Sequence, residues 1–297
     1  MSQNGETFQL IRGTTELDIS DLINYHVVEF DGFGMSPVRR LTQRGPLQNG
    51  DTDVGFRLDP RTMRVAVLAY SSTPAAMHTK REQLLGLLRP GTDAVKLRWT
   101  YANAGGTVQR QIDCHVQGGL SLGSSGLIKN NWRDVVEFRA SDPTWYDPVG
   151  GSVQFAQTGG GTPWAVPVVF PTNFGASNLS GSATIDLSDA NAWDTFPIIY
   201  ATGPVTGLVI TNTATGDKLD FTGYSIGAGV TYTIDLRYGN KTVVDSTGTI
   251  RISQLTQDSN HATFRLVPGA NTITVTGTSI TAATNIYIQY NTRFIGV

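Results

Sequence analysis

The side chains with the most obvious capacity for chemistry are four histidines, and their spacing decides what they can do. His26, His78, His115 and His261 are far apart, and no pair has the HxH or HxxxH spacing that brings two imidazoles to one metal ion. His26 and His115 fall in strand-like runs, where a hydrogen-bonded structural imidazole is the ordinary role. His78 falls on the polar face of a predicted helix. The sequence therefore predicts no metal site.

Grouped carboxylates are a second possibility, because glycosidases place two of them about 5–10 Å apart across the bond they cleave. The candidate groups are Asp51/Asp53, Asp142/Asp147 and Asp186/Asp189/Asp194. Each group stands in a turn-like stretch, where an aspartate usually caps its own backbone. The last group also lacks the alternating oxygens and central glycine of a calcium loop. We therefore expect no catalytic residue, no cofactor and no enzymatic activity, with a hydrolase as the weakest alternative.

Two aromatic side chains keep a sugar-binding interpretation open. Trp164 and Trp193 are the tryptophans of the second half, and an exposed ring beside polar groups can stack on a sugar. A core or edge-covering role is the more ordinary one for each. A carbohydrate-binding module that recognises host cell-surface glycans is therefore the alternative function, with these two tryptophans as its stacking candidates.

Composition points to a β-rich protein. Of 297 residues, 39% are hydrophobic and only 15% charged, with 33 glycines, which favours turns and strands over helices. The net charge of −2 provides no electrostatic footprint for nucleic acid. The single cysteine, Cys114, excludes an internal disulfide and is expected to be a buried thiol. We find neither a leader segment nor an apolar run long enough to span a membrane, and we expect synthesis in a cytoplasm.

One helix is predicted, with strands on either side of it. Thr73 is suited to the N-cap and Pro74 to the first helical position. Met77, Leu84, Leu85 and Leu88 then form one apolar stripe before Pro90-Gly91 ends the helix. Period-two alternation predicts strands over residues 63–70 and 132–140. Between them it predicts a hairpin, with strands over 97–101 and 108–116 and a turn at 103–106. The first half is therefore expected to be α+β, a β-sandwich or split barrel with one helix.

A change of composition predicts two domains. The Gly- and Pro-containing stretch 149–163 is the expected linker between residues 1–148 and 164–297. Charged side chains are much denser before it than after it, which indicates two folding units with different surfaces. The second unit shows strands at about the 8–12-residue spacing of a β-sandwich or jelly roll. Mainly β architecture in two domains is the predicted fold class.

An arginine-rich excursion interrupts the first domain. Residues 39–61 combine arginines with glycines, prolines and apolar side chains, and so long an excursion in a compact domain is usually functional or disordered. Arginine suits protein contacts because its planar, weakly hydrated head can fork onto a carboxylate. The candidate oligomer-interface residues are Arg39, Arg40, Gln43, Arg44, Gly45, Arg57 and Arg61.

The order of several short motifs resembles the distal tail proteins (Dit) of long-tailed, non-contractile bacteriophages. The motifs are DGFG at 31–34, Pro37-Val38, Gln43-Arg44-Gly45, Asp59-Pro60-Arg61, Arg89-Pro90-Gly91 and Asp142-Pro143-Thr144-Trp145-Tyr146-Asp147. The pattern covers roughly residues 7–148. Residues 264–271, FRLVPGAN, are similar to the penultimate hairpin of galectin-like jelly rolls that end many tail proteins.

This resemblance implies a structural virion protein. It implies a homohexameric hub ring at the tail tip, with the first domains around a central channel for DNA passage and galectin-like domains outside. The partners it implies are the tail tube protein and a tail-tip protein or receptor-binding fibre, with no specific nucleic-acid recognition and no membrane. A structural assembly protein is thus the leading hypothesis, ahead of the carbohydrate-binding module and the hydrolase.

Overall fold

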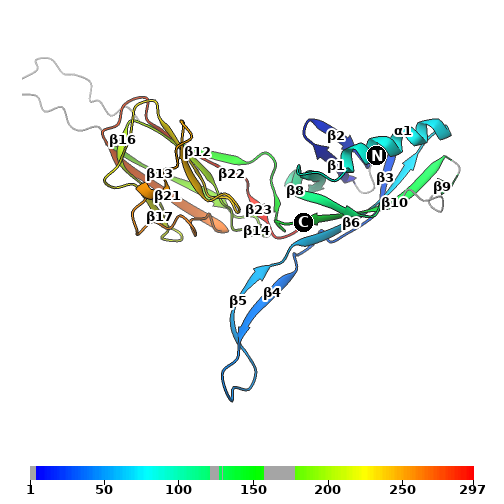
Figure 1. Ribbon diagram of the computed structural model, residues 1–297, viewed down its shortest axis with the longest axis horizontal. Helices are drawn as coiled ribbons and strands as arrows, with labels where there is room; N and C mark the ends of the chain where they lie inside the picture. The colour runs from blue at the N-terminus through cyan, green and yellow to red at the C-terminus, as the bar shows by residue number, and fades with distance from the viewer. Residues whose placement is uncertain (1–4, 121–126, 129, 157–177) are drawn as a thin grey trace, which may run out of the picture. The chain divides into compact units, whose positions relative to one another are not determined.

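The computed structural model describes residues 5–120, 127–128, 130–156 and 178–297. The chain divides into two compact units, Met1–Pro148 with Phe294–Val297 and Val149–Arg293, which we call the first and second unit (Figure 1). The chain therefore leaves the first unit after Pro148 and returns to it after the second unit is complete. Residues 294–297 were expected in the second domain and instead belong to the first.

The first unit consists of antiparallel strands and one α-helix. Its elements are β1 (Thr7–Arg12), β2 (Thr15–Asp18), β3 (Tyr25–Asp31), β4 (Val38–Gln43), β5 (Thr52–Leu58), β6 (Arg61–Tyr70), α1 (Pro74–Leu88), β7 (Val95–Asn103), β8 (Gly106–Gly118), β9 (Leu127–Ile128), β10 (Asn131–Ala140) and β11 (Trp145–Tyr146). The main sheet has the order β2-β1-β7-β8-β10-β6-β3. Over the described residues β2 and β3 are the two ends of this strand order. The expected mainly β first unit with one helix is confirmed.

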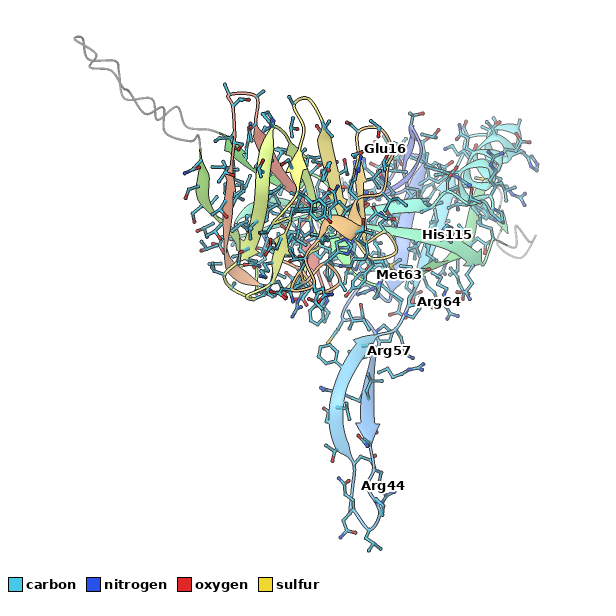
Figure 2. All side chains as sticks on the ribbon, turned by 60° about the vertical axis from the view of Figure 1, so that its left-hand side comes forward. Glu16, Arg44, Arg57, Met63, Arg64 and His115 are labelled. Carbon is cyan, nitrogen blue, oxygen red and sulfur yellow. The ribbon has the colours of Figure 1, made fainter. Side chains whose placement is uncertain are left out.

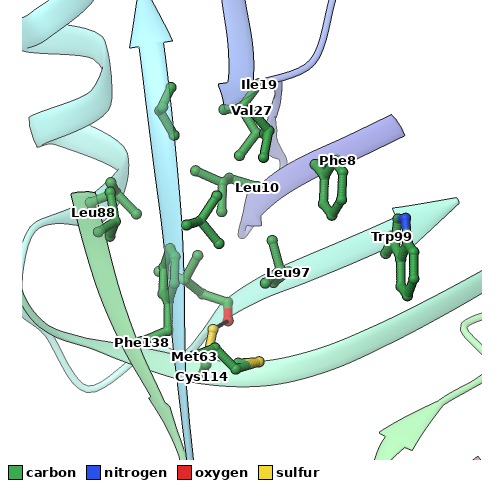
Figure 3. Close-up of a cluster of buried hydrophobic side chains, with 14 of the residues drawn as sticks. Phe8, Leu10, Ile19, Val27, Met63, Leu88, Leu97, Trp99, Cys114 and Phe138 are labelled. Atoms are coloured by element: carbon green, nitrogen blue, oxygen red, sulfur yellow. Dashed lines mark hydrogen bonds between the residues drawn. The ribbon is translucent and has the colours of Figure 1, made fainter. Parts of the chain in front are cut away.

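Alternation along the strands places the core of the first unit. On β6, Met63, Val65 and Val67 are buried and Arg64 is exposed, because successive side chains point to opposite faces of a sheet. Figure 3 shows Met63 and Phe138 beside Cys114, whose thiol donates a hydrogen bond to the Val95 carbonyl at 3.1 Å. The expectation that Cys114 is buried is confirmed.

Helix α1 begins at the predicted residue, but the set of side chains that it buries differs from the prediction at one position. The Thr73 hydroxyl accepts a hydrogen bond from the Ala76 amide at 3.2 Å, and Pro74 occupies the first turn. Met77, Leu84, Leu87 and Leu88 are buried, whereas Leu85 is 42% exposed. Leu85 and Leu87 lie on opposite sides of the stripe centred on the other three, and packing against the sheet selected Leu87.

The second unit is a β-sandwich. Its elements are β12 (Gly151–Ala156), β13 (Leu179–Leu187), β14 (Ala192–Trp193), β15 (Ile198–Thr202), β16 (Val205–Asn212), β17 (Lys218–Asp220), β18 (Ser225–Ile226), β19 (Thr231–Asp235), β20 (Thr242–Asp245), the 3-10 helix η3 (Ile252–Gln254), β21 (Gly269–Thr278), β22 (Asn285–Tyr290) and β23 (Arg293–Phe294), whose last residue lies in the first unit. One sheet has the order β12-β22-β15-β19-β20, and the other β13-β21-β16-β17 with β18 on β16.

The expected linker is partly a strand. Residues 151–156 form β12, which pairs with β22 from Gly151 opposite Tyr290 to Ala156 opposite Asn285. Alternation explains this, because Val153 and Phe155 pack toward the apolar core of the sandwich. The remaining expected linker residues, 157–163, lie outside the described part of the chain.

Candidate assembly interface

The arginine-rich excursion forms a long β-hairpin, which we call the arm (residues 38–59). Strands β4 and β5 pair antiparallel from Val38 opposite Leu58 to Gln43 opposite Thr52, with a register shift at Val54. Figure 2 shows the hairpin projecting away from the sheet of the first unit, with Arg57 nearer its root and Arg44 toward its tip. In the described structure β4 and β5 form a separate two-stranded sheet.

Both faces of the arm lie in solvent. All six residues of β4 are exposed, and β5 has only two half-buried positions. A two-stranded hairpin is marginally stable in water unless one face packs against something else. The arm therefore has the geometry of an element that is completed by another surface.

The arginines of the arm are paired within the arm. Arg39 Nε lies 3.0 Å from Asp59 Oδ2, and Arg57 Nε lies 3.7 Å from the other oxygen of the same carboxylate. Arg40 Nη1 lies 3.1 Å from Asp53 Oδ2, across the two strands. These side chains are mostly exposed, and such ion pairs typically contribute no more than about 1 kcal/mol each. Two arginines share one carboxylate, which leaves the root of the arm with an excess of positive charge.

Apolar side chains accompany these arginines. Val54 is 63% exposed, Phe56 48% and Leu41 42%, and Leu47 at the tip is fully exposed. Arg40 lies over the Phe56 ring, with 5.6 Å between its guanidinium carbon and the ring centroid. Aromatic residues and arginine are enriched in protein interfaces. The arm thus combines the residue types of an interface on a scaffold that cannot bury them itself.

The tip of the arm is fixed by Gln48. Its side-chain carbonyl accepts from the Gly45 amide at 2.9 Å, and its amide nitrogen donates to the Thr52 hydroxyl at 2.8 Å. Gly50 adopts a φ of 78°, which favours glycine. Of the predicted interface residues, the structure therefore brings Arg39, Arg40, Gln43, Arg44, Gly45 and Arg57 together on the arm.

Arg61 does not belong with them, and this is a correction to the sequence-based prediction. Its side chain is 1% exposed, at the start of β6 below the arm. All five of its N–H groups are used: they donate to the carbonyls of Gly32, Gly34, Pro143 and Ile295 and to the Ser36 hydroxyl, at 2.5–2.9 Å. Desolvation lowers the pKa of the Arg61 guanidinium to about 10, so the group remains charged at neutral pH.

The other candidate residues do not converge on a site. Asp51 and Asp53 lie on the arm beside arginines. Asp142 caps a turn by accepting from the Thr144 amide and hydroxyl. Burial raises the pKa of Asp194, although Arg265 lies 2.9 Å away and opposes this effect. Asp51, Asp53, Asp142 and Asp194, which could have belonged to glycosidase pairs, are thus each engaged locally.

The histidines and tryptophans are likewise dispersed. His78 and His115 are exposed, and burial lowers the pKa of the half-buried His261. Trp193 is half-buried in β14, and Trp164 lies outside the described residues. No group of three or more histidine, cysteine or acidic side chains in the described residues could hold a metal ion. Among those residues, no helix is long and apolar enough to cross a membrane.

Comparisons with known proteins agree with this fold. Residues 190–294 match a protein-family model described as the C-terminal domain of a siphovirus-type tail component. No protein of curated function matches the chain by sequence. Among solved structures, the chain is similar to the crystal structure of the SPP1 Dit (gp 19.1) protein, described as a paradigm of the hub adsorption apparatus in phages that infect Gram-positive bacteria. The match has a TM-score of 0.62 and 13% sequence identity, and it covers 97% of this chain and 99% of that chain.

A second solved structure is similar over the same extent. A chain of the phage P2 baseplate, in its activated conformation with Ca, matches with a TM-score of 0.50 and 7% identity, covering 98% of this chain and 99% of that one. At such identities the likeness is one of fold. The similarity in fold extends through both units.

Proposed function

We propose that this chain is a distal tail protein of a siphovirus-type phage and forms the structural hub of the tail tip, a homohexameric ring. The central channel of this ring would let DNA pass. The proposal rests on the family match in the second unit and on a fold that follows the SPP1 hub protein through both units. It describes a protein that works through surfaces and not through a catalytic site.

The observation that supports the proposed ring is the exposed, two-stranded arm. A hairpin that exposes Val54, Phe56 and Leu41 on a two-stranded sheet needs a partner surface. When the partner is the next copy of the same chain, the contact is heterologous, and repeated rotation closes it into a ring. The arm also offers its own unpaired strand edges to a neighbour's sheet.

Further contacts follow from the same role. A hub at the tail tip must meet the tail tube protein on one side and a tail-tip protein or receptor-binding fibre on the other. The structure named for SPP1 is a hub adsorption apparatus, and the second is a baseplate. We extend these assemblies to this chain as part of the proposal, with the virion as its location and the host cytoplasm as its place of synthesis.

The mass of the purified protein in solution tests the ring. Six chains of 32.0 kDa give a species of about 192 kDa by light scattering, visible as a ring by negative-stain microscopy. Deletion of residues 41–53 should leave a folded monomer whose melting temperature stays close to the wild-type value. A deletion variant that still forms the full oligomer would show that the arm is not the assembly element.

The alternative function is sugar binding, with Trp164 and Trp193 as the candidate stacking residues. Half-burial of Trp193 leaves part of its ring accessible, which is the one observation in its favour. Substituting both tryptophans by alanine and measuring binding to host cell-wall polysaccharide tests it. Loss of binding with the melting temperature retained would support a glycan site in the second unit.

A further inference from the structure

The root of the arm is assembled from four parts of the chain that are separated in the sequence. Arg61 stands where the arm rejoins the sheet, and the loop between β3 and β4, residues 32–37, forms the other side of the root. Pro143 follows β10, and Ile295 follows the entire second unit. Nε of Arg61 donates to the Pro143 carbonyl at 2.9 Å, and Nη2 donates to the Ile295 carbonyl at 2.7 Å, 234 positions away.

The returning segment 294–297 makes contacts of its own in the same place. The Val297 amide donates to the Phe33 carbonyl at 3.2 Å. Gly296 lies so close to the loop that a Cβ there would be 2.6 Å from the Gly34 carbonyl oxygen. Phe294 is buried in the core, with the Arg110 guanidinium carbon 3.5 Å from its ring centroid. The segment is therefore held by packing at one end and by backbone hydrogen bonds at the other.

The loop at the root is fixed at its two ends, where Phe33 is buried and the Ser36 hydroxyl donates to the Pro143 carbonyl at 3.0 Å. Between these ends, Met35 is 72% exposed and Gly34 is exposed, so hydrophobic burial does not hold the middle of the loop. Nη1 of Arg61 donates to its carbonyls at Gly32 and Gly34, and Nη2 donates to its Ser36 hydroxyl. A planar guanidinium sets the directions of all its donors at once. The Arg61 side chain thus contacts the middle of the loop, the Pro143 carbonyl and the returning segment at once.

We infer that Arg61 is the positioning residue of the arm, and that residues 295–297 complete the binding site of its side chain. We call this site the socket; its other parts are the loop 32–37 and Pro143. The direction in which the arm projects then depends on the return of the chain from the second unit. The arm is synthesised early, but it reaches its final direction only after residues 295–297 have been synthesised and have packed against the first unit. This inference concerns the arm of a single chain and stands whether or not the proposed ring forms.

Distances within the monomer test the inference directly. Spin labels are attached to two introduced cysteines. One replaces Asn49, an exposed residue in the loop between β4 and β5. The other replaces His115, an exposed position on β8 (Figure 2). The native thiol is removed by Cys114→Ala. Pulsed electron paramagnetic resonance is recorded at a dilution where light scattering shows a monomer, so that assembly plays no part in the result.

Two substitutions disturb the socket from opposite sides, and a third substitution, outside the socket, serves as the control. Arg61→Met removes all five donors, and Gly296→Ala places a methyl group against the Gly34 carbonyl. Arg64→Met removes an arginine three residues further along β6 that is exposed and pairs with Glu137 at 2.6 Å. Gly296→Ala keeps Arg61 in place, so the test survives even when Arg61→Met fails to fold.

The expected result is a narrow distance distribution in the background protein and in Arg64→Met. In Gly296→Ala, and in Arg61→Met where it folds, the distribution should shift or broaden. A narrow, unshifted distribution in Gly296→Ala, or a distribution already broad in the background protein, would overturn the inference. Loss of the oligomer in the arm deletion tests the ring separately and leaves this result unaffected.

Discussion

Arg40 and Phe56 face each other across the two strands of the arm, with the guanidinium carbon 5.6 Å from the ring centroid. Neither side chain is buried by this contact, since Phe56 remains 48% exposed. A paired but exposed aromatic residue contributes little to the stability of a monomer. Its value lies in an interface, where the same ring can be desolvated by a neighbour.

The first prediction concerns the apolar surface of the arm. Val54→Ser combined with Phe56→Ser should change the free energy of unfolding by no more than about 0.5 kcal/mol per site, because both residues are exposed. The same variant should lose the species of high mass in light scattering. Ile23→Ser, at a 78% exposed position away from the arm, should retain it. Equal assembly in both variants would contradict the role of the arm.

The second prediction contrasts two arginines that are close in sequence. Arg57→Met should lower the free energy of unfolding by less than about 1 kcal/mol, because its ion pair with Asp59 is exposed. Arg61→Met should lower it by about 3 kcal/mol or more, because buried carbonyls lose their donor. Urea titration followed by tryptophan fluorescence measures both. Similar losses in the two variants would show that burial does not distinguish them.

The third prediction is a pH dependence in the second unit. Hydrogen bonds lower the pKa of Asp245, that from the Thr247 hydroxyl most strongly, followed by those from the Thr249 amide and the Arg251 side chain. A carboxyl with a lowered folded pKa stabilises the fold above its unfolded pKa of about 4 and loses this contribution as the pH falls further.

Asp245→Asn should therefore lower the melting temperature of the second unit at neutral pH and flatten its decline below about pH 4. Differential scanning calorimetry across the acid range measures the effect. Asp258→Asn, at an exposed carboxylate, should leave the profile unchanged. An Asp245→Asn protein with the wild-type acid profile would show that this turn does not control acid stability.

The fourth prediction concerns the buried thiol. Burial raises the pKa of Cys114, and a thiol that is neither ionised nor accessible does not react with disulfide reagents. Native protein should show no reaction with Ellman's reagent at neutral pH, and urea-unfolded protein should react at one site. Rapid reaction of the native protein would mean that the core around Met63 and Phe138 opens readily.

Local sequence determined the elements of this protein. Alternation of Met63, Val65 and Val67 with polar residues predicted a strand, and Thr73-Pro74 predicted the start of the helix, because both signals depend on backbone geometry within a few residues. The order of motifs also predicted the family, and the mainly β architecture is confirmed. Residue types alone indicated an arm rich in interface-forming side chains.

Tertiary structure alone decided which of those side chains face solvent. Arg57 and Arg61 share a residue type and a sequence neighbourhood, yet one lies on the arm and the other is buried. The carbonyls that accept from Arg61 come from Gly32, Pro143 and Ile295, and no local pattern brings these together. Burying an arginine requires acceptors for all its donors, and only the completed fold supplies them.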